Sequence, residues 1–126
     1  MDTKLFLLFL ICHFIGDFSH CSLVMFPSVL KAKSIGAPLL PILLHAGVHG
    51  ICVFLAVLPF FGLWMALLAF LLEWSTHTGI DVLKGRLNVW IPSLTNPKNI
   101  WYWWSFGLDQ MAHMLVLVAI NVLVSN

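Results

Sequence analysis

Histidine and acidic residues recur four positions apart in each strongly apolar stretch of this sequence. The pairs are His13 with Asp17, His45 with His49, Glu73 and Asp81 with His77, and Asp109 with His113. Residues four positions apart lie on one face of an α-helix. Each stretch, if helical, therefore presents its pair in one direction. Imidazole and carboxylate groups are ligands of divalent transition metals, so the spacing predicts a metal site built by several helices.

The stretches that carry these pairs are long enough to cross a lipid bilayer. The chain has 126 residues, of which 61% are hydrophobic and 9% are charged, whereas soluble domains carry about 25% charged residues. A membrane-spanning helix needs about 20 apolar residues. Apolar runs bounded by proline, glycine or charge predict four spans, at residues 5–25, 38–58, 63–83 and 104–124. We therefore predict an all-α fold, a four-transmembrane-helix bundle, with a single transmembrane domain over residues 1–126.

The connections between the spans predict how the bundle is arranged. Residues 59–62 form a very short connection, so the second and third spans should make a tight antiparallel hairpin. One side of the predicted bundle carries most of the basic residues, Lys31, Lys33, Lys84, Arg86 and Lys98, and only Lys4 lies on the other side. The positive-inside rule places the two basic loops in the cytoplasm and both termini outside.

Four carboxylates inside the apolar runs need a counter-charge. A charged side chain within hydrocarbon costs several kcal/mol, and Asp17, Glu73, Asp81 and Asp109 all lie in predicted spans. We find no lysine or arginine deep in any span, and the nearest, Lys84, lies at a helix end. We therefore expect bound cations to balance these acids.

The depths of the paired residues in the predicted bundle suggest two layers of ligands. The layer nearer the cytoplasm comprises Asp17, His45, His77 and Asp109, and one helical turn deeper lie His13, His49, Glu73 and His113. Two such layers suit two metal ions. Zinc is the expected metal, with iron or manganese as alternatives. The expected ligands are His13, Asp17, His45, His49, His77, Asp81, Asp109 and His113.

Four segments of the chain resemble a known family. They are residues 13–18 (HFIGDF), 45–49 (HAGVH), 77–84 (HTGIDVLK) and 109–113 (DQMAH), in order along nearly the whole chain. This set is similar to domain-of-unknown-function family 3307, whose members are small bacterial and phage inner-membrane proteins. The resemblance implies a multi-pass protein of the bacterial inner (cytoplasmic) membrane. It supports the site and implies no particular reaction.

A membrane-embedded hydrolase with two zinc ions is the leading hypothesis for the function. Two metals can polarise a phosphoryl or acyl oxygen and supply hydroxide at neutral pH, and Glu73 or Asp81 would act as general base. A site at bilayer depth suggests a lipid or lipid-linked substrate. The alternatives are a di-iron or di-manganese oxidoreductase, a metal-ion or proton transporter, and a phage or host-interaction protein with a structural metal. A homo-oligomer is compatible with each of these, and a transporter with so few spans would need one.

Simpler interpretations apply to some of these residues. The paired set could form a hydrogen-bonded or proton-relay network without metal. His20 lies outside the four-residue spacing and is expected to be an interhelical hydrogen-bonding residue. The cysteines, Cys12, Cys21 and Cys52, are expected to pack as small hydrophobic residues. The chain has no basic tract, so we expect no nucleic-acid partner.

Overall fold

The protein is helical throughout the part of the chain that the structure describes. The computed structural model describes residues 1–18, 27–29, 31–33 and 39–126. Its main helices are α1 (Thr3–Phe18), α3 (Leu39–Trp90) and α4 (Ile100–Val124), with a short 3-10 helix, η1 (Pro92–Thr95), before α4. Residues 27–29 and 31–33 are also helical. The predicted all-α class is confirmed for these residues.

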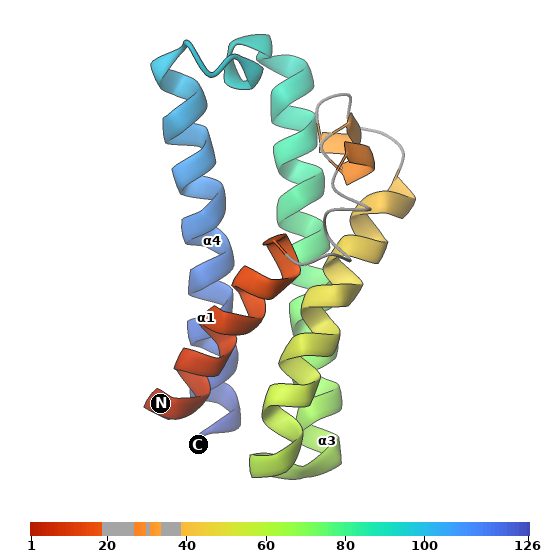
Figure 1. Cartoon of the computed structure of the whole chain (residues 1–126), viewed down its shortest axis with the longest axis vertical. Helices are drawn as coiled ribbons and strands as arrows, with labels where there is room; N and C mark the ends of the chain where they lie inside the picture. Colours follow the sequence, from red (N-terminus) through yellow and green to blue (C-terminus); the bar gives the residue numbers. More distant parts are fainter. Residues whose placement is uncertain (19–26, 30, 34–38) are drawn as a thin grey trace.

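Helix α3 is a hairpin of two arms, residues 39–61 and 63–90, that meet at Gly62. Gly62 has φ 78° and ψ 178°, a backbone conformation outside the helical region. Figure 1 shows the two arms running in opposite directions side by side. The Trp74 indole donates a 3.0 Å hydrogen bond from the second arm to the Leu43 carbonyl oxygen in the first. The short connection predicted at residues 59–62 therefore does reverse the chain.

Replacing Gly62 with alanine is expected to destabilise the hairpin by about 1–3 kcal/mol, because this combination of φ and ψ is open almost only to glycine. Thermal unfolding of the purified protein in detergent would measure the loss. Gly107→Ala in α4 is the control, because a Cβ there has no atom within 4 Å and the backbone is not at positive φ. Equal unfolding temperatures for the two variants would contradict the prediction.

The two termini meet at the end of the molecule where the α3 hairpin turns (Figure 1). The Asn121 side chain, fully buried in α4, accepts a 2.9 Å hydrogen bond from the Asp2 backbone N–H and donates one of 2.9 Å to the Asp2 carbonyl oxygen. The Asp2 side chain also accepts from the Leu5 backbone N–H at the start of α1. These bonds tie the beginning of α1 to the end of α4, so the two ends of the chain lie at the same end of the molecule.

Helices α3 and α4 are long and apolar enough to cross a membrane. In their most apolar stretches only 17% of the residues in α3 and 28% in α4 are buried, whereas the core helix of a soluble protein would be mostly buried. The 16 residues of α1 fall short of the predicted first span. The remainder of that span, residues 19–25, lies outside the described residues.

Two helices extend beyond the membrane spans predicted for them. The second arm of α3 continues past residue 83 to Trp90, because lysine and arginine are good helix formers once they lie beyond the apolar layer. Helix α4 begins at Ile100 rather than at residue 104, since the Asn99 side chain caps it by accepting from the Trp101 backbone N–H at 3.0 Å.

Candidate metal centre

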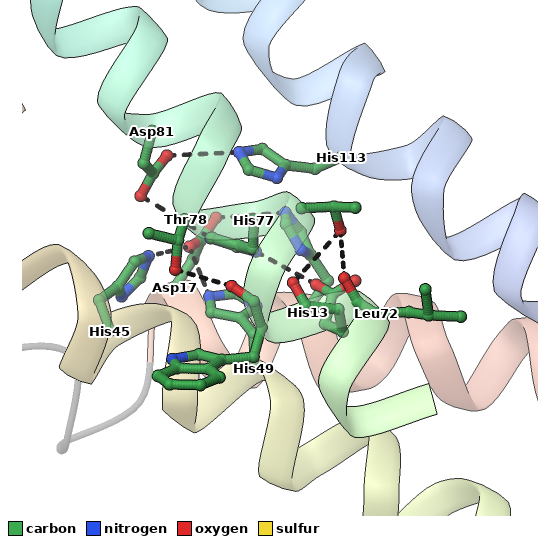
Figure 2. Close-up of polar contacts among 12 residues, drawn as sticks. His13, Asp17, His45, His49, Leu72, His77, Thr78, Asp81 and His113 are labelled. Carbon is green, nitrogen blue, oxygen red and sulfur yellow. Dashed lines mark hydrogen bonds and ion pairs between the residues drawn. The ribbon is translucent and has the colours of Figure 1, made fainter. Parts of the chain in front are cut away.

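Side chains from all three main helices converge in one buried polar cluster, which we call the His/Asp cluster. Figure 2 shows its imidazole rings and carboxylates pointing toward one another. Eight of its nine members are between 0% and 9% exposed, and Asp17 is 19% exposed. The cluster comprises His13, Asp17, His45, His49, Glu73, His77, Asp81, Asp109 and His113. All eight predicted metal ligands and Glu73 are thus brought together.

Asp17 of α1 is the meeting point for histidines from two helices. Its Oδ1 lies 3.2 Å from His49 Nε2 and 3.5 Å from His45 Nε2, both on the first arm of α3. Its Oδ2 lies 3.5 Å from Nε2 of His13, one turn earlier on α1. The four-residue spacing places each pair on one helix face, and the packing of α1 on α3 then joins the two pairs.

His77 of the second α3 arm lies between two carboxylates of its own helix. Its Nδ1 lies 3.1 Å from Glu73 Oε1, within hydrogen-bond distance, and its Nε2 lies 3.8 Å from Asp81 Oδ2. His113 of α4 reaches the same region, with Nε2 3.4 Å from Asp81 Oδ1 and 3.9 Å from Asp109 Oδ1. The ring centroids of His77 and His113 are 4.0 Å apart. Asp81 therefore connects α3 to α4.

Within this cluster, several groups of side chains have ligand atoms close enough to share one ion. In each group the ligand atoms lie within 4.8 Å of one another. The groups are His13, His49, Glu73 and His77; Asp17, His45 and His49; His45, His77 and Asp81; and Asp81, Asp109 and His113. The first and last groups share no residue, so the cluster has donors for two ions at once.

These groups differ from the two layers expected from depth along the spans. His13, His49 and Glu73 come together as expected for the deeper layer, but their fourth neighbour is His77 rather than His113. His113 instead joins Asp109 and Asp81. Depth counted along each helix ignores helix rotation and inclination, and α1 is visibly inclined to the other helices (Figure 1).

A lysine side chain reaches the His/Asp cluster. This contradicts the expectation that no basic side chain could balance the buried acids. Lys33 Nζ forms an ion pair with Asp81 Oδ1, and Asp81 is fully buried. Lys33 belongs to the basic connection before α3 and is distant from Asp81 in sequence, so no local spacing could reveal the contact. The predicted nearest base, Lys84, instead donates a hydrogen bond to the Ser105 hydroxyl.

The positive charge of one lysine does not balance the negative charge of the carboxylates in the cluster. Four carboxylates lie in it, and Lys33 is paired with one of them. Glu73 Oε2, Asp81 Oδ2 and Asp109 Oδ1 are buried atoms with no hydrogen-bond partner among the described residues. Buried acceptors left in this state are costly, and a cation placed between carboxylates and neutral imidazoles removes the cost. The residues present therefore fit divalent metal ions.

A cavity of about 600 Å³ opens beside the cluster at the end formed by η1 and the start of α4. Three members of the cluster line it, Asp17, His45 and Asp109. Its other polar walls are Lys31, Lys33, Lys84, Asn88, Thr95, Tyr102 and Gln110, and its apolar walls are Val29, Leu94, Pro97 and Phe106. Lys84 and Gln110 lie in segments that resemble the family, but the histidine–acid spacing singled out none of these further residues, because they come from four separate segments.

Comparison with known protein families places this chain in one of them. A family model described as "Protein of unknown function (DUF3307)" matches residues 5–126. The chain belongs to this family. No curated protein and no solved structure matches the chain.

The family that the four short segments resemble is therefore confirmed, and the matched residues 5–126 include every member of the His/Asp cluster. Cys12 and Cys52 are free thiols and belong to none of the donor groups; the Cys12 thiol donates to the Cys52 carbonyl oxygen at 3.3 Å. His20 and Cys21 lie outside the described residues.

Proposed function

We propose that this protein is a membrane-embedded metal-dependent hydrolase that acts on a lipid or lipid-linked substrate. The observation that carries the proposal is the pair of separate donor groups, one closed and one beside a cavity. Structural zinc sites have four protein ligands, whereas catalytic sites have three and an open position. His13, His49, Glu73 and His77 suit a closed site, and Asp81, Asp109 and His113 suit an open one.

Exposed tryptophans support the crossing of a bilayer by the helices. Trp64, at the start of the second α3 arm, is 82% exposed, and Trp90, at its end, is 68% exposed. At a helical rise of 1.5 Å per residue they lie about 39 Å apart, close to the 40–45 Å thickness of a bilayer with its headgroups. Tryptophan favours both membrane interfaces. Both arms of α3, together with α1 and α4, would then form the four-span topology, with the basic loops in the cytoplasm.

The residues of the chain divide into two roles in this proposal. A metal ion at the open site would polarise the scissile group and lower the pKa of bound water. Asp17 lines the cavity and is partly exposed, so it can accept a proton from an attacking water and is our candidate general base. Glu73 does not line the cavity, and we assign it, with Asp81, to metal binding rather than to the base role considered from sequence.

Elemental analysis of the purified protein tests the two donor groups. We expect about two zinc ions per chain, as the sum of one closed and one open site. Asp109→Asn should lower this to about one, because the open site keeps only two strong donors. Asp2→Asn is the control, since Asp2 is a carboxylate at the terminus, outside the cluster. A wild-type protein without metal, or equal metal content in both variants, would refute the two-site assignment.

An activity assay tests the reaction. Zinc-loaded protein in vesicles of a bacterial total lipid extract should release a hydrolysis product detectable by mass spectrometry, and a chelator should abolish the release. Asp17→Asn should keep the zinc of the closed site while losing about 10²–10⁴-fold in rate, the usual contribution of a general base. Retained zinc without chelator-sensitive hydrolysis would favour a structural metal. Visible-light absorption by bound oxidised iron would favour the oxidoreductase alternative. Metal uptake into proteoliposomes would favour the transporter alternative.

A further inference from the structure

Two members of the His/Asp cluster, Asp17 and His45, belong to neither of the two metal sites assigned above. Both line the cavity beside the cluster. Together with His49 they form a further donor group, whose ligand atoms lie within 4.8 Å of one another. His49 is also a donor of the closed site. The group of Asp17, His45 and His49 therefore connects the cavity to the closed site through one shared histidine.

The closed site itself does not face the cavity. Its four donors are between 1% and 6% exposed, and none of them is among the described residues that line the cavity. A cation without ligands in a buried, apolar region is very unfavourable. An ion that passes between the cavity and the closed site therefore needs other donors along its path.

The distances in the cluster fit a path through Asp17 and the two histidines of the first α3 arm. Asp17 Oδ1 lies 3.5 Å from His45 Nε2 and 3.2 Å from His49 Nε2, and Figure 2 shows the three side chains together. The centroid of the His49 ring lies 4.1 Å from that of His77 and 4.8 Å from that of His13. An ion bound to His49 can therefore reach either group without leaving this imidazole.

A second path from the cavity to the closed site is less favourable. His45 also belongs to a donor group with His77 and Asp81. Asp81 is ion-paired with Lys33, so an ion on this path would have to displace a lysine ammonium. The ion pairs of Asp17 in the described part of the chain are all with histidines. Neutral imidazoles can share a carboxylate with a metal ion, so the path through Asp17 is the one that the charges favour.

From these contacts we infer that Asp17, His45 and His49 form a transfer site, through which the metal ion of the closed site enters and leaves by way of the cavity. The inference rests on the proposed function, because it uses the closed site defined there. His45 binds the ion only in transit, whereas His49 is a ligand before and after the transfer. Asp17 is released when the closed site is filled and is then available as general base.

The transfer is an exchange of ligands on one divalent ion, without oxidation or reduction. The bonds from the ion to the Asp17 carboxylate and the His45 imidazole break. Bonds to the remaining closed-site donors, His13, Glu73 and His77, form in their place. Zinc accepts four ligands and can expand to five, which allows the ligands to be replaced one at a time. One carboxylate is exchanged for another, so the charge around the ion is the same at both ends of the path.

Exchange of bound zinc for isotopically enriched zinc, followed by mass spectrometry, tests the transfer site in the zinc-loaded protein. The measurement is made in the Asp109→Asn background, which should retain only the ion of the closed site. There His45→Asn should slow the exchange about tenfold or more, because an ion in transit loses a ligand and the barrier rises. The content should stay at about one zinc per chain. Asp17→Asn should slow the exchange as well. Thr95→Val is the control, since Thr95 lines the same cavity but belongs to no donor group.

An unchanged or faster exchange in His45→Asn, or equal slowing in Thr95→Val, overturns the inference. Loss of zinc from folded His45→Asn protein also overturns it, because His45 would then be a resident ligand. If His45→Asn does not fold, the exchange rate of Asp17→Asn decides.

The same variants separate this inference from the proposed function. Slow exchange in His45→Asn, together with a wild type that shows no chelator-sensitive hydrolysis, would leave the transfer site standing and refute the hydrolase proposal. Hydrolysis by a protein whose zinc exchange does not depend on His45 or Asp17 would do the reverse. A wild-type protein that binds no zinc would refute both.

Discussion

Replacing His49 with alanine is expected to lower bound zinc from about two ions per chain to about one and to destabilise the bundle by about 3 kcal/mol. His49 is 1% exposed, its Nε2 lies 3.2 Å from Asp17 Oδ1, and its ring is within 5 Å of those of His13, His45 and His77. It belongs to two of the four donor groups. Its loss removes a proposed ligand and leaves the Asp17 carboxylate with fewer hydrogen-bonding partners.

Thermal unfolding with and without a chelator separates these two effects. The chelator should lower the unfolding temperature of the wild type substantially and that of His49→Ala much less, because metal binding contributes directly to stability. Val53→Ala is the matched control. Val53 is also buried, on the same helix one turn further on, so its loss leaves a cavity without removing a ligand. If His49→Ala keeps full zinc content and full chelator sensitivity, His49 is not a ligand.

Replacing Gly16 with alanine is expected to have a comparable effect, although glycine has no metal-binding group. A Cβ at Gly16 would lie 2.4 Å from His49 Cε1 and 2.6 Å from its Nε2, well inside van der Waals contact. The His49 ring is buried among other cluster members and has little room to turn. The variant must therefore displace the ring or move α1 away from α3, and either change breaks the 3.2 Å contact to Asp17.

Gly79→Ala is the control for Gly16→Ala. Both glycines are helical and both lie within two positions of cluster residues in the sequence, but a Cβ at Gly79 has no atom within 4 Å. We expect Gly16→Ala to lose about one zinc per chain and 1–3 kcal/mol, as overpacking of a core does, and Gly79→Ala to gain up to about 1 kcal/mol from helix propensity. Zinc retention by Gly16→Ala at wild-type stability would show that α1 packs on α3 differently.

The members of the cluster could be predicted from sequence because each pair is local to one helix. His13 with Asp17 and Asp109 with His113 are four residues apart, and helical geometry alone places each pair on one face. Their burial follows from electrostatics, since charged or polar groups on apolar helices are expected to face one another rather than lipid. The hairpin at Gly62 is equally local, because the reversal depends on the backbone conformation of this one glycine between two helical arms.

The grouping of donors could not be predicted in the same way. The histidine that joins His13, His49 and Glu73 in one donor group depends on the rotation of each helix and on the inclination of α1. The spacing of residues in the sequence reveals neither. The close approach at Gly16 shows the difference clearly. Gly16, Gly47, Gly50 and Gly79 all flank polar positions, yet an added Cβ would clash at Gly16, would be tight against Phe70 at Gly50, and would meet open space at Gly79.

The sequence by itself determined the helical class, the reversal near Gly62 and the identity of the ligand-type residues, because these depend on neighbours within one or two helical turns. Only the tertiary structure decided that Lys33 reaches Asp81, that two donor groups are separate, and that three lysines face one cavity. These features join residues from different segments, and their distances depend on how the helices pack. Helix packing depends on the summed energy of many contacts between distant segments, so it cannot be inferred from any short stretch of sequence.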